Sequence, residues 1–107
     1  MDIEKIRNLN DQLRKTFTGG KVFITQGVRY LDVTDQIVLI NKIKTFDSFN
    51  YSNDPHNEHD FGAVNLKGED YFWKIDYYDA DYLHFSPCPS DEAVTNRVLT
   101  ILRAEEY

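Results

Sequence analysis

The chain has 107 residues, 41% of them hydrophobic and 14% aromatic, with a net charge of −6 and one cysteine, Cys88. This apolar content and length predict one folded domain over residues 1–107, and the single cysteine excludes an internal disulfide or a multi-cysteine zinc site. No apolar run reaches the ~20 residues of a membrane span and the charged first residues lack a signal-peptide pattern, so we expect a cytoplasmic protein.

The first half of the chain predicts two helices around a short strand. Asp2 can cap a first helix that ends at Gly19, and residues 21–25 (KVFIT) have the β-branched and aromatic content of a strand. After a turn, a second helix is predicted to begin near residues 32–34, and residues 47–58 form a loop by composition. The apolar residues at helical spacing are Ile3, Ile6, Leu9, Leu13 and Phe17 in the first helix, and Leu39, Ile40, Ile43 and Phe46 in the second.

Two runs in the middle of the chain, DFGAVNLK (60–67) and YFWKIDYY (71–78), are typical of a β-hairpin. With Gly68 and Glu69 as the turn, the predicted pairs are Lys67 with Asp70, Val64 with Trp73, Ala63 with Lys74, Phe61 with Asp76 and His59 with Tyr78. Strand alternation then predicts a core side and an outer side. The core side carries Val64, Leu66, Tyr71, Trp73, Ile75 and Tyr77. The outer side carries His59, Phe61, Asn65, Phe72, Lys74, Asp76 and Tyr78.

The last segment predicts an ordered loop and a third helix. Pro87 and Pro89 favour a loop, and Ser90 can cap a helix that follows it. The buried stripe of this helix is predicted to be Val94, Val98, Ile101 and Leu102. The resulting order α-β-α-β-β-α, with a small, mainly antiparallel sheet and helices packed on one face, is an α+β fold.

Three stretches resemble one family: EHDFG (58–62), FWKIDYYD (72–79) and RVLTILRAEEY (97–107). The family consists of small bacterial proteins of unknown function, common in alphaproteobacterial genomes and on their plasmids. The resemblance implies a single cytosolic domain and an accessory gene on mobile DNA. It carries over no functional residue, so any site has to be argued from the chain itself.

A metal site is one candidate function, because His56, Glu58 and His59 carry ligands suited to zinc, manganese or iron, with Asp60 beside them. The two histidines are three residues apart where a loop becomes a strand, and strand alternation sends His59 and Asp60 to opposite faces. The alternative is a turn at residues 53–55 with exposed histidines. Asp60, on the core side, is then predicted to be a structural latch bound by the loop.

An acid/base site is the second candidate, because His59, Lys74 and Asp76 share the outer side of the predicted hairpin with Tyr78. Restriction-type nucleases place an acidic residue two positions before their lysine, but Phe72 occupies that position here. The alternative is an ordinary charge pair on a wet sheet face, worth ~0.2 to 1 kcal/mol. No glycine-rich phosphate loop and no nucleophile elbow is present, so no cofactor is expected.

A binding surface is the leading hypothesis, because charge is concentrated in the middle of the chain. Residues 47–92 contain 11 Asp and Glu but only 2 Lys and Arg, interleaved with aromatic residues. Such a surface disfavours direct binding to nucleic acid and favours a basic protein partner, including a nucleic-acid-binding protein approached as a phosphate mimic. The alternatives are a solvated acidic face, and a metal-dependent hydrolase or acid/base enzyme. The predicted binding residues are Tyr51, Asp54, Glu58, Asp76, Tyr78, Asp79, Asp81 and Tyr82.

Overall fold

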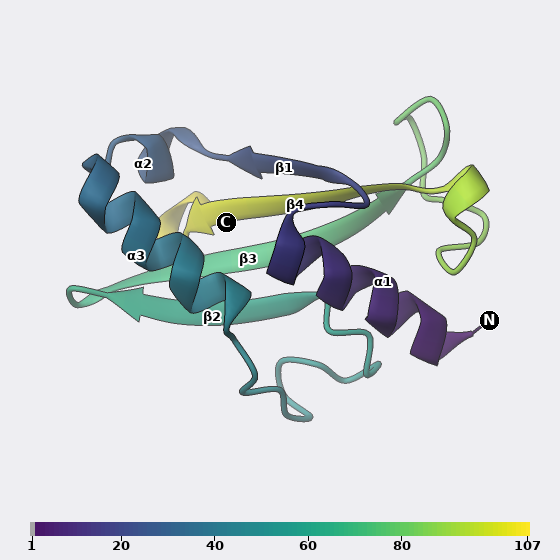
Figure 1. Ribbon diagram of the computed structural model, residues 1–107, viewed down its shortest axis with the longest axis horizontal. Helices are drawn as coiled ribbons and strands as arrows, with labels where there is room; N and C mark the ends of the chain where they lie inside the picture. Colours follow the sequence, from purple (N-terminus) through teal and green to yellow (C-terminus); the bar gives the residue numbers. More distant parts are fainter. Residues whose placement is uncertain (1) are drawn as a thin grey trace.

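The computed structural model describes residues 2–107 and contains three helices and four strands. The helices are α1 (Ile3–Thr16), α2 (Gln26–Arg29) and α3 (Val33–Lys44), and the strands are β1 (Lys21–Ile24), β2 (Phe61–Leu66), β3 (Glu69–Tyr78) and β4 (Asn96–Arg103). The sheet order is β1-β4-β3-β2, with β1 parallel to β4 and the other two pairings antiparallel. Both long helices lie on the same face of this sheet (Figure 1). The α+β fold class is therefore confirmed.

The two long helices begin where the sequence predicts. Asp2 accepts a hydrogen bond from the Lys5 N–H at 3.0 Å, and Asp32 accepts one from the Asp35 N–H at 2.8 Å. Helix α1 ends at Phe17, which takes the left-handed conformation (φ 59°), two residues before the predicted glycine. The apolar residues that the two long helices bury completely are Ile6, Leu13, Leu39 and Ile43, all from the predicted apolar stripes.

The predicted third helix is wrong, because residues 96–103 form strand β4. Val98, Ile101 and Leu102 match a helical spacing, but β4 lies inside the sheet and has buried side chains on both of its faces. Ile101 pairs with Trp73 on the helix side, whereas Leu102 pairs with Phe72 on the other side. A strand buried on both faces is a continuous apolar run, which cannot be told from a buried helix by periodicity. The order of elements therefore ends in a strand.

The predicted hairpin is present, but its turn and register differ. Leu66 pairs with Glu69 and Val64 with Tyr71, so the turn is Lys67-Gly68 rather than Gly68-Glu69. Both turn residues have positive φ (53° and 85°), which a tight two-residue hairpin turn requires. The predicted pairing is two residues out of register. Because side chains alternate with a period of two, this shift leaves the division into core and outer sides unchanged.

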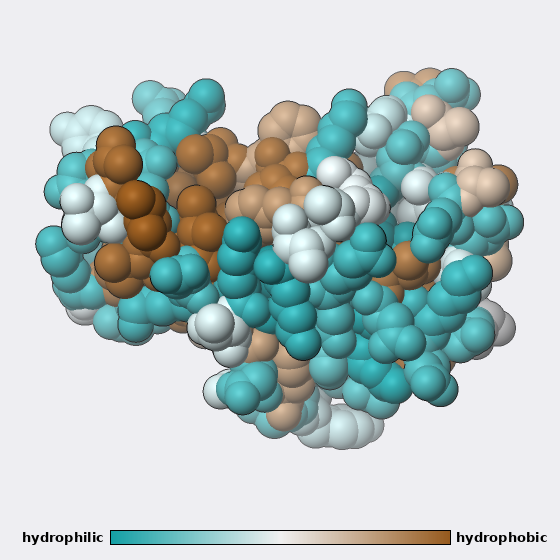
Figure 2. Space-filling model, viewed as in Figure 1, coloured by the Kyte–Doolittle hydropathy of each residue, from teal (hydrophilic) through white to brown (hydrophobic). Residues whose placement is uncertain are grey.

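The two faces of the sheet are covered differently. On the helix-covered face, apolar residues gather over α2 and α3, whereas the surface over α1 is hydrophilic (Figure 2). Within residues 2–107, no α-helix packs on the opposite face, which we call the open face, although the C-terminal Tyr107 contacts Phe61 and Phe72 there. Its side chains come from alternate strand positions and include Lys21, Phe23, Phe61, Phe72, Lys74, Asp76, Tyr78 and Thr100. Among the described residues, no helix has the length and apolar character needed to span a bilayer.

Candidate functional site

The loop between α3 and β2, residues 46–60, is closed by Asp54. Its side chain is only 3% exposed, and Oδ1 accepts hydrogen bonds from the N–H groups of Glu58 (3.0 Å) and His59 (3.1 Å). Asp54 therefore fills the latch role that the sequence suggested for Asp60. Desolvation and the nearby Glu58 raise the pKa of Asp60. A carboxylate held by two N–H groups costs less to bury than one that lacks such donors.

His59 lies on the helix side of the sheet, so its predicted place on the outer side is wrong. It precedes β2 and has φ 56°, outside the strand geometry that alternation assumes. Its ring stacks on Phe49 with 3.7 Å between ring centres, and Phe49 packs edge-on against the buried Trp73. Nδ1 is 2.8 Å from Oδ1 of Asp11, and Nε2 is 3.7 Å from Oδ2 of Asp54. Two carboxylates thus hold the imidazole in place.

Arg14 fastens the 46–60 loop to both long helices. Its side chain is 1% exposed, and Nη1 donates to the carbonyl oxygens of Ile43 (3.0 Å), Lys44 (3.2 Å) and Phe46 (2.9 Å). These carbonyls lie at the C-terminal end of α3, where the helix leaves acceptors unpaired. Nη2 donates to Asp11 at 3.2 Å, the carboxylate that also contacts His59. Arg14, Asp11, His59 and Asp54 form one continuous polar chain.

A second polar group joins the same loop to β3 and β4. The fully buried Asn10 donates to Tyr77 Oη (2.7 Å) and accepts from Arg97 Nε (2.8 Å). Tyr77 in turn donates to Glu58 Oε1 at 2.6 Å. Burial, and then the bond to Glu58, raise the pKa of Tyr77, which keeps this donor protonated. Burial lowers the pKa of Arg97, whose guanidinium also donates to the carbonyl of Pro89.

The sequence analysis missed three of these residues, Asn10, Arg14 and Arg97, although two of them left a signal. Asn10 and Arg14 follow Ile6 at spacings of four, so they share the buried face of α1 with Leu13. A polar residue on a buried helical stripe has to find partners inside the protein. That rule would have identified the first two. Arg97 left no such signal, because its segment was expected to be helical.

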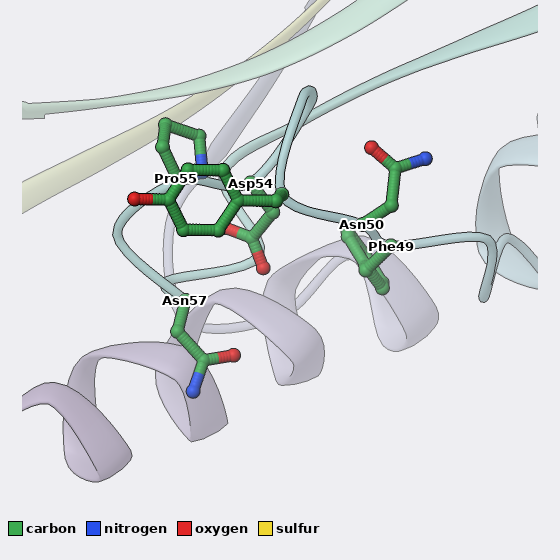
Figure 3. A pocket seen from close by; sticks show the side chains of 6 residues that line it. Phe49, Asn50, Asp54, Pro55 and Asn57 are labelled. Atoms are coloured by element: carbon green, nitrogen blue, oxygen red, sulfur yellow. The ribbon is translucent and has the colours of Figure 1, made fainter.

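The outer side of the 46–60 loop contains an open pocket of about 310 Å³ (Figure 3). The close-up shows Asn50 and Asn57 on opposite sides of Asp54, with Pro55 beside it. The pocket is lined by Phe49, Asn50, Tyr51, Asp54, Pro55 and Asn57. Of the predicted binding residues, this region holds Tyr51 and Asp54. Of these two residues, Asp54 belongs to the polar chain described above, whereas Tyr51 is exposed and does not belong to it.

The metal candidates lie in the same loop but have other partners. His56 is exposed, Glu58 is bound by Tyr77, and His59 is bound by Asp11. Across residues 2–107, no three His, Cys, Asp or Glu side chains are grouped in a way that could hold an ion. Metal binding by His56, Glu58 and His59 stays a prediction.

The acid/base candidates are divided between the two faces of the sheet. Lys74 and Asp76 meet on the open face, with 2.7 Å between Nζ and Oδ2, as neighbours along the same strand. The hydrogen bond that Lys74 donates to Asp76 raises the pKa of Lys74, so its ammonium is charged at neutral pH and cannot accept a proton. His59 lies on the opposite side of β3. The structure therefore brings together two of the three predicted groups.

The segment after β3, residues 78–85, brings four predicted binding residues together: Tyr78, Asp79, Asp81 and Tyr82. We call it the 78–85 loop. Asp79 accepts hydrogen bonds from the N–H groups of Asp81 (3.2 Å) and Leu83 (3.1 Å), and its own N–H donates to the His84 carbonyl (2.8 Å). Desolvation opposes the charge of Asp79, but the backbone donors outweigh it and lower its pKa. The carboxylate is therefore ionised at neutral pH and fixes the loop.

The 78–85 loop exposes apolar side chains that the sequence analysis did not select. Leu83 is 74% exposed and Phe85 is 81% exposed, and together with Tyr78 and His84 they line a hollow of about 510 Å³. Tyr82 has φ 59°, which is uncommon for an aromatic residue and implies local strain. Such strain persists where the surrounding hydrogen bonds determine the conformation. The loop is thus an ordered structure that presents apolar surface to solvent.

The fold and these contacts define a single α+β domain whose 46–60 loop is fastened inward and whose 78–85 loop faces outward. The chain belongs to the family described as "protein of unknown function (DUF3768)", whose model matches residues 24–106. The matched range begins after α1, so Asp11 and Arg14 lie outside it while both loops lie within it. No curated protein and no solved structure matches the chain.

Proposed function

We propose that this protein is a non-enzymatic binding module whose 78–85 loop holds a basic segment of a protein partner. The observation that supports this most is the exposure of Leu83 and Phe85 on a loop fixed by the hydrogen bonds of Asp79. Ordering a loop costs ~1 to 2 kcal/mol of conformational free energy per residue. Apolar side chains that stay exposed do not offset this cost, because they bury no surface when the protein folds. A partner that covers them gains that apolar burial.

The charges of the loop favour a basic partner. Asp79 and the exposed Asp81 belong to the same loop as the residues that line the apolar hollow, and the aromatic rings of Tyr78 and Tyr82 are neighbours, 6.1 Å apart between ring centres. A cation already uses this surface, because Lys21 Nζ lies 4.5 Å from the centre of the Tyr82 ring. Arginine or lysine from a partner can bind in the same manner over an aromatic ring of this acidic loop.

The proposal places the protein in the bacterial cytoplasm, as its family resemblance implies, with a basic nucleic-acid-binding protein as the partner. An acidic loop would then compete with phosphates for the partner's lysines and arginines. The acid/base alternative retains Lys74 and Asp76 but lacks His59 on the same face. We therefore propose binding rather than catalysis.

The test uses short peptides that carry several arginines around one leucine or phenylalanine, with glutamate in place of arginine in the control peptide. We expect the full chain to bind the basic peptide, and the double substitution Leu83→Ser and Phe85→Ser to weaken binding at least about tenfold, equivalent to ~1.4 kcal/mol. Ile37→Ser is the matched control, because Ile37 is also exposed but lies on α3. Equal binding of both peptides, or unchanged binding by the double variant, would contradict the proposal.

A further inference from the structure

The free edge of strand β2 has main-chain groups without partners. The Ile75 N–H donates to the Asp60 carbonyl at 2.9 Å, so in this register residues 60, 62, 64 and 66 exchange hydrogen bonds with β3. The N–H and C=O groups of Ala63 and Asn65 then point away from β3. Both residues are exposed, and no hydrogen bond within residues 2–107 engages their main-chain groups. This edge offers alternating donors and acceptors to another strand.

The edge also lacks the features that usually protect such a strand. Folded proteins block free edges with proline, with charged side chains or with a bulge. The β2 sequence is FGAVNL, without proline or charge, and its pairing with β3 is regular through all six positions. The charged residues next to the strand lie outside it: Asp60 precedes it, and Lys67 follows it and is held by Asp35 at 3.1 Å. An edge without these features is open to pairing with another strand.

A groove runs beside the edge on the helix-covered side. Its volume is about 370 Å³, and it is lined by residues 45–48 and Lys42 on one side and by residues 63–65 on the other. An extended chain paired with β2 would direct alternate side chains into this groove and the others toward the open face. A second copy of this protein would bring its own residues 45–48 into the same space. The groove therefore suits a lone strand better than another folded copy.

We propose that the β2 edge binds an extended, proline-free segment of another protein, which adds to the sheet as a fifth strand. Main-chain pairing with Ala63 and Asn65 supplies the affinity, and the groove selects alternate side chains. This surface is separate from the 78–85 loop, which follows the end of β3 that is farther from the hairpin turn (Figure 1). The two proposals can therefore fail independently.

Amide hydrogen exchange and a displayed library of short random peptides test the proposal together. In the free protein the amides of Ala63 and Asn65 should exchange quickly, whereas those of Gly62 and Val64 should be protected. Peptides selected from the library should protect Ala63 and Asn65 on binding, and should do so equally in the Leu83→Ser and Phe85→Ser double variant. Protection of Ala63 and Asn65 that depends on protein concentration without peptide would indicate a second copy and overturn the proposal.

Backbone N-methylation of a selected peptide distinguishes strand pairing from groove binding. Methyl groups on the N–H groups that face β2 should weaken binding at least about tenfold, whereas methyl groups on the alternate N–H groups should leave it unchanged. On the protein side, Ala63→Pro removes one outward N–H at an edge position that tolerates proline, and Ala63→Ser retains it as the control. If methylation of the two sets of N–H groups had the same effect, strand addition would be refuted. Equal peptide binding by a folded Ala63→Pro variant would also refute it.

Discussion

The 46–60 loop and the 78–85 loop are closed by the same kind of hydrogen bonding, but they turn their side chains in opposite directions. In each, one aspartate accepts two backbone N–H groups: Asp54 from Glu58 and His59, and Asp79 from Asp81 and Leu83. The first loop turns Glu58 and His59 inward, where Tyr77 of the sheet and Asp11 of helix α1 contact them. The second turns apolar side chains outward. Acidic composition alone therefore does not show which segment forms a binding surface.

Replacing Arg14 with alanine should have the largest effect on the inward-facing loop. The substitution leaves the carbonyls of Ile43, Lys44 and Phe46 without their side-chain donor and removes one of the two partners of Asp11. At ~1 to 3 kcal/mol for each unpaired buried group, a loss of ~3 to 5 kcal/mol is expected. Chemical denaturation followed by circular dichroism measures this loss. Lys15→Ala, at the exposed neighbouring position, is the control and should change stability by less than ~0.5 kcal/mol. A similar small change for Arg14→Ala would show that the loop is fastened by other contacts.

Replacing Asp54 with alanine should have the next largest effect. Two partly buried N–H groups then lose their acceptor, at a cost of ~1 to 3 kcal/mol in the free energy of unfolding. The amides of Glu58 and His59 should also lose protection from hydrogen exchange. Asp47→Ala, an exposed acid in the same loop, should change neither quantity. Retained protection in the Asp54 variant would mean that Asp54 is not the latch.

The sequence was most informative where one local rule determines the structure. The caps at Asp2 and Asp32 and the two sides of the hairpin follow from spacing and alternation. The sequence-based predictions failed where contacts between residues far apart in the chain determine the structure. Whether residues 96–103 form a helix or a strand depends on neighbours that lie far away in the sequence. The partners of His59 lie in α1 and at Asp54, and no local pattern reveals that Asp11 reaches it.

Replacing Asp60 with asparagine should change the free energy of unfolding in the opposite direction to the Asp54 variant. Desolvation, with Glu58 nearby, raises the pKa of Asp60 above its usual value of 3.8, so the folded protein holds this charge at a cost at neutral pH. A neutral asparagine should make the protein slightly more stable at pH 7. In the wild-type protein this cost disappears as the pH falls through the raised pKa and Asp60 becomes protonated. The stability advantage of the asparagine variant should therefore vanish near pH 3.8. Unfolding curves of both proteins across that range test this sign, with Asp47→Asn as the control. A loss of stability at pH 7 would indicate that Asp60 is itself a latch.

Removing the exposed apolar side chains of the 78–85 loop should have the smallest effect on stability. Leu83 and Phe85 lie mostly in solvent, so Leu83→Ser with Phe85→Ser should change the free energy of unfolding by less than ~0.5 kcal/mol each. Ile75→Ser on the adjacent strand, where the side chain is 4% exposed, should cost several times more, because it removes buried apolar surface and buries a hydroxyl. Thermal unfolding of the three proteins makes the comparison. If the double variant were as destabilised as Ile75→Ser, the loop would contribute to the core, and its exposed residues would no longer argue for a partner.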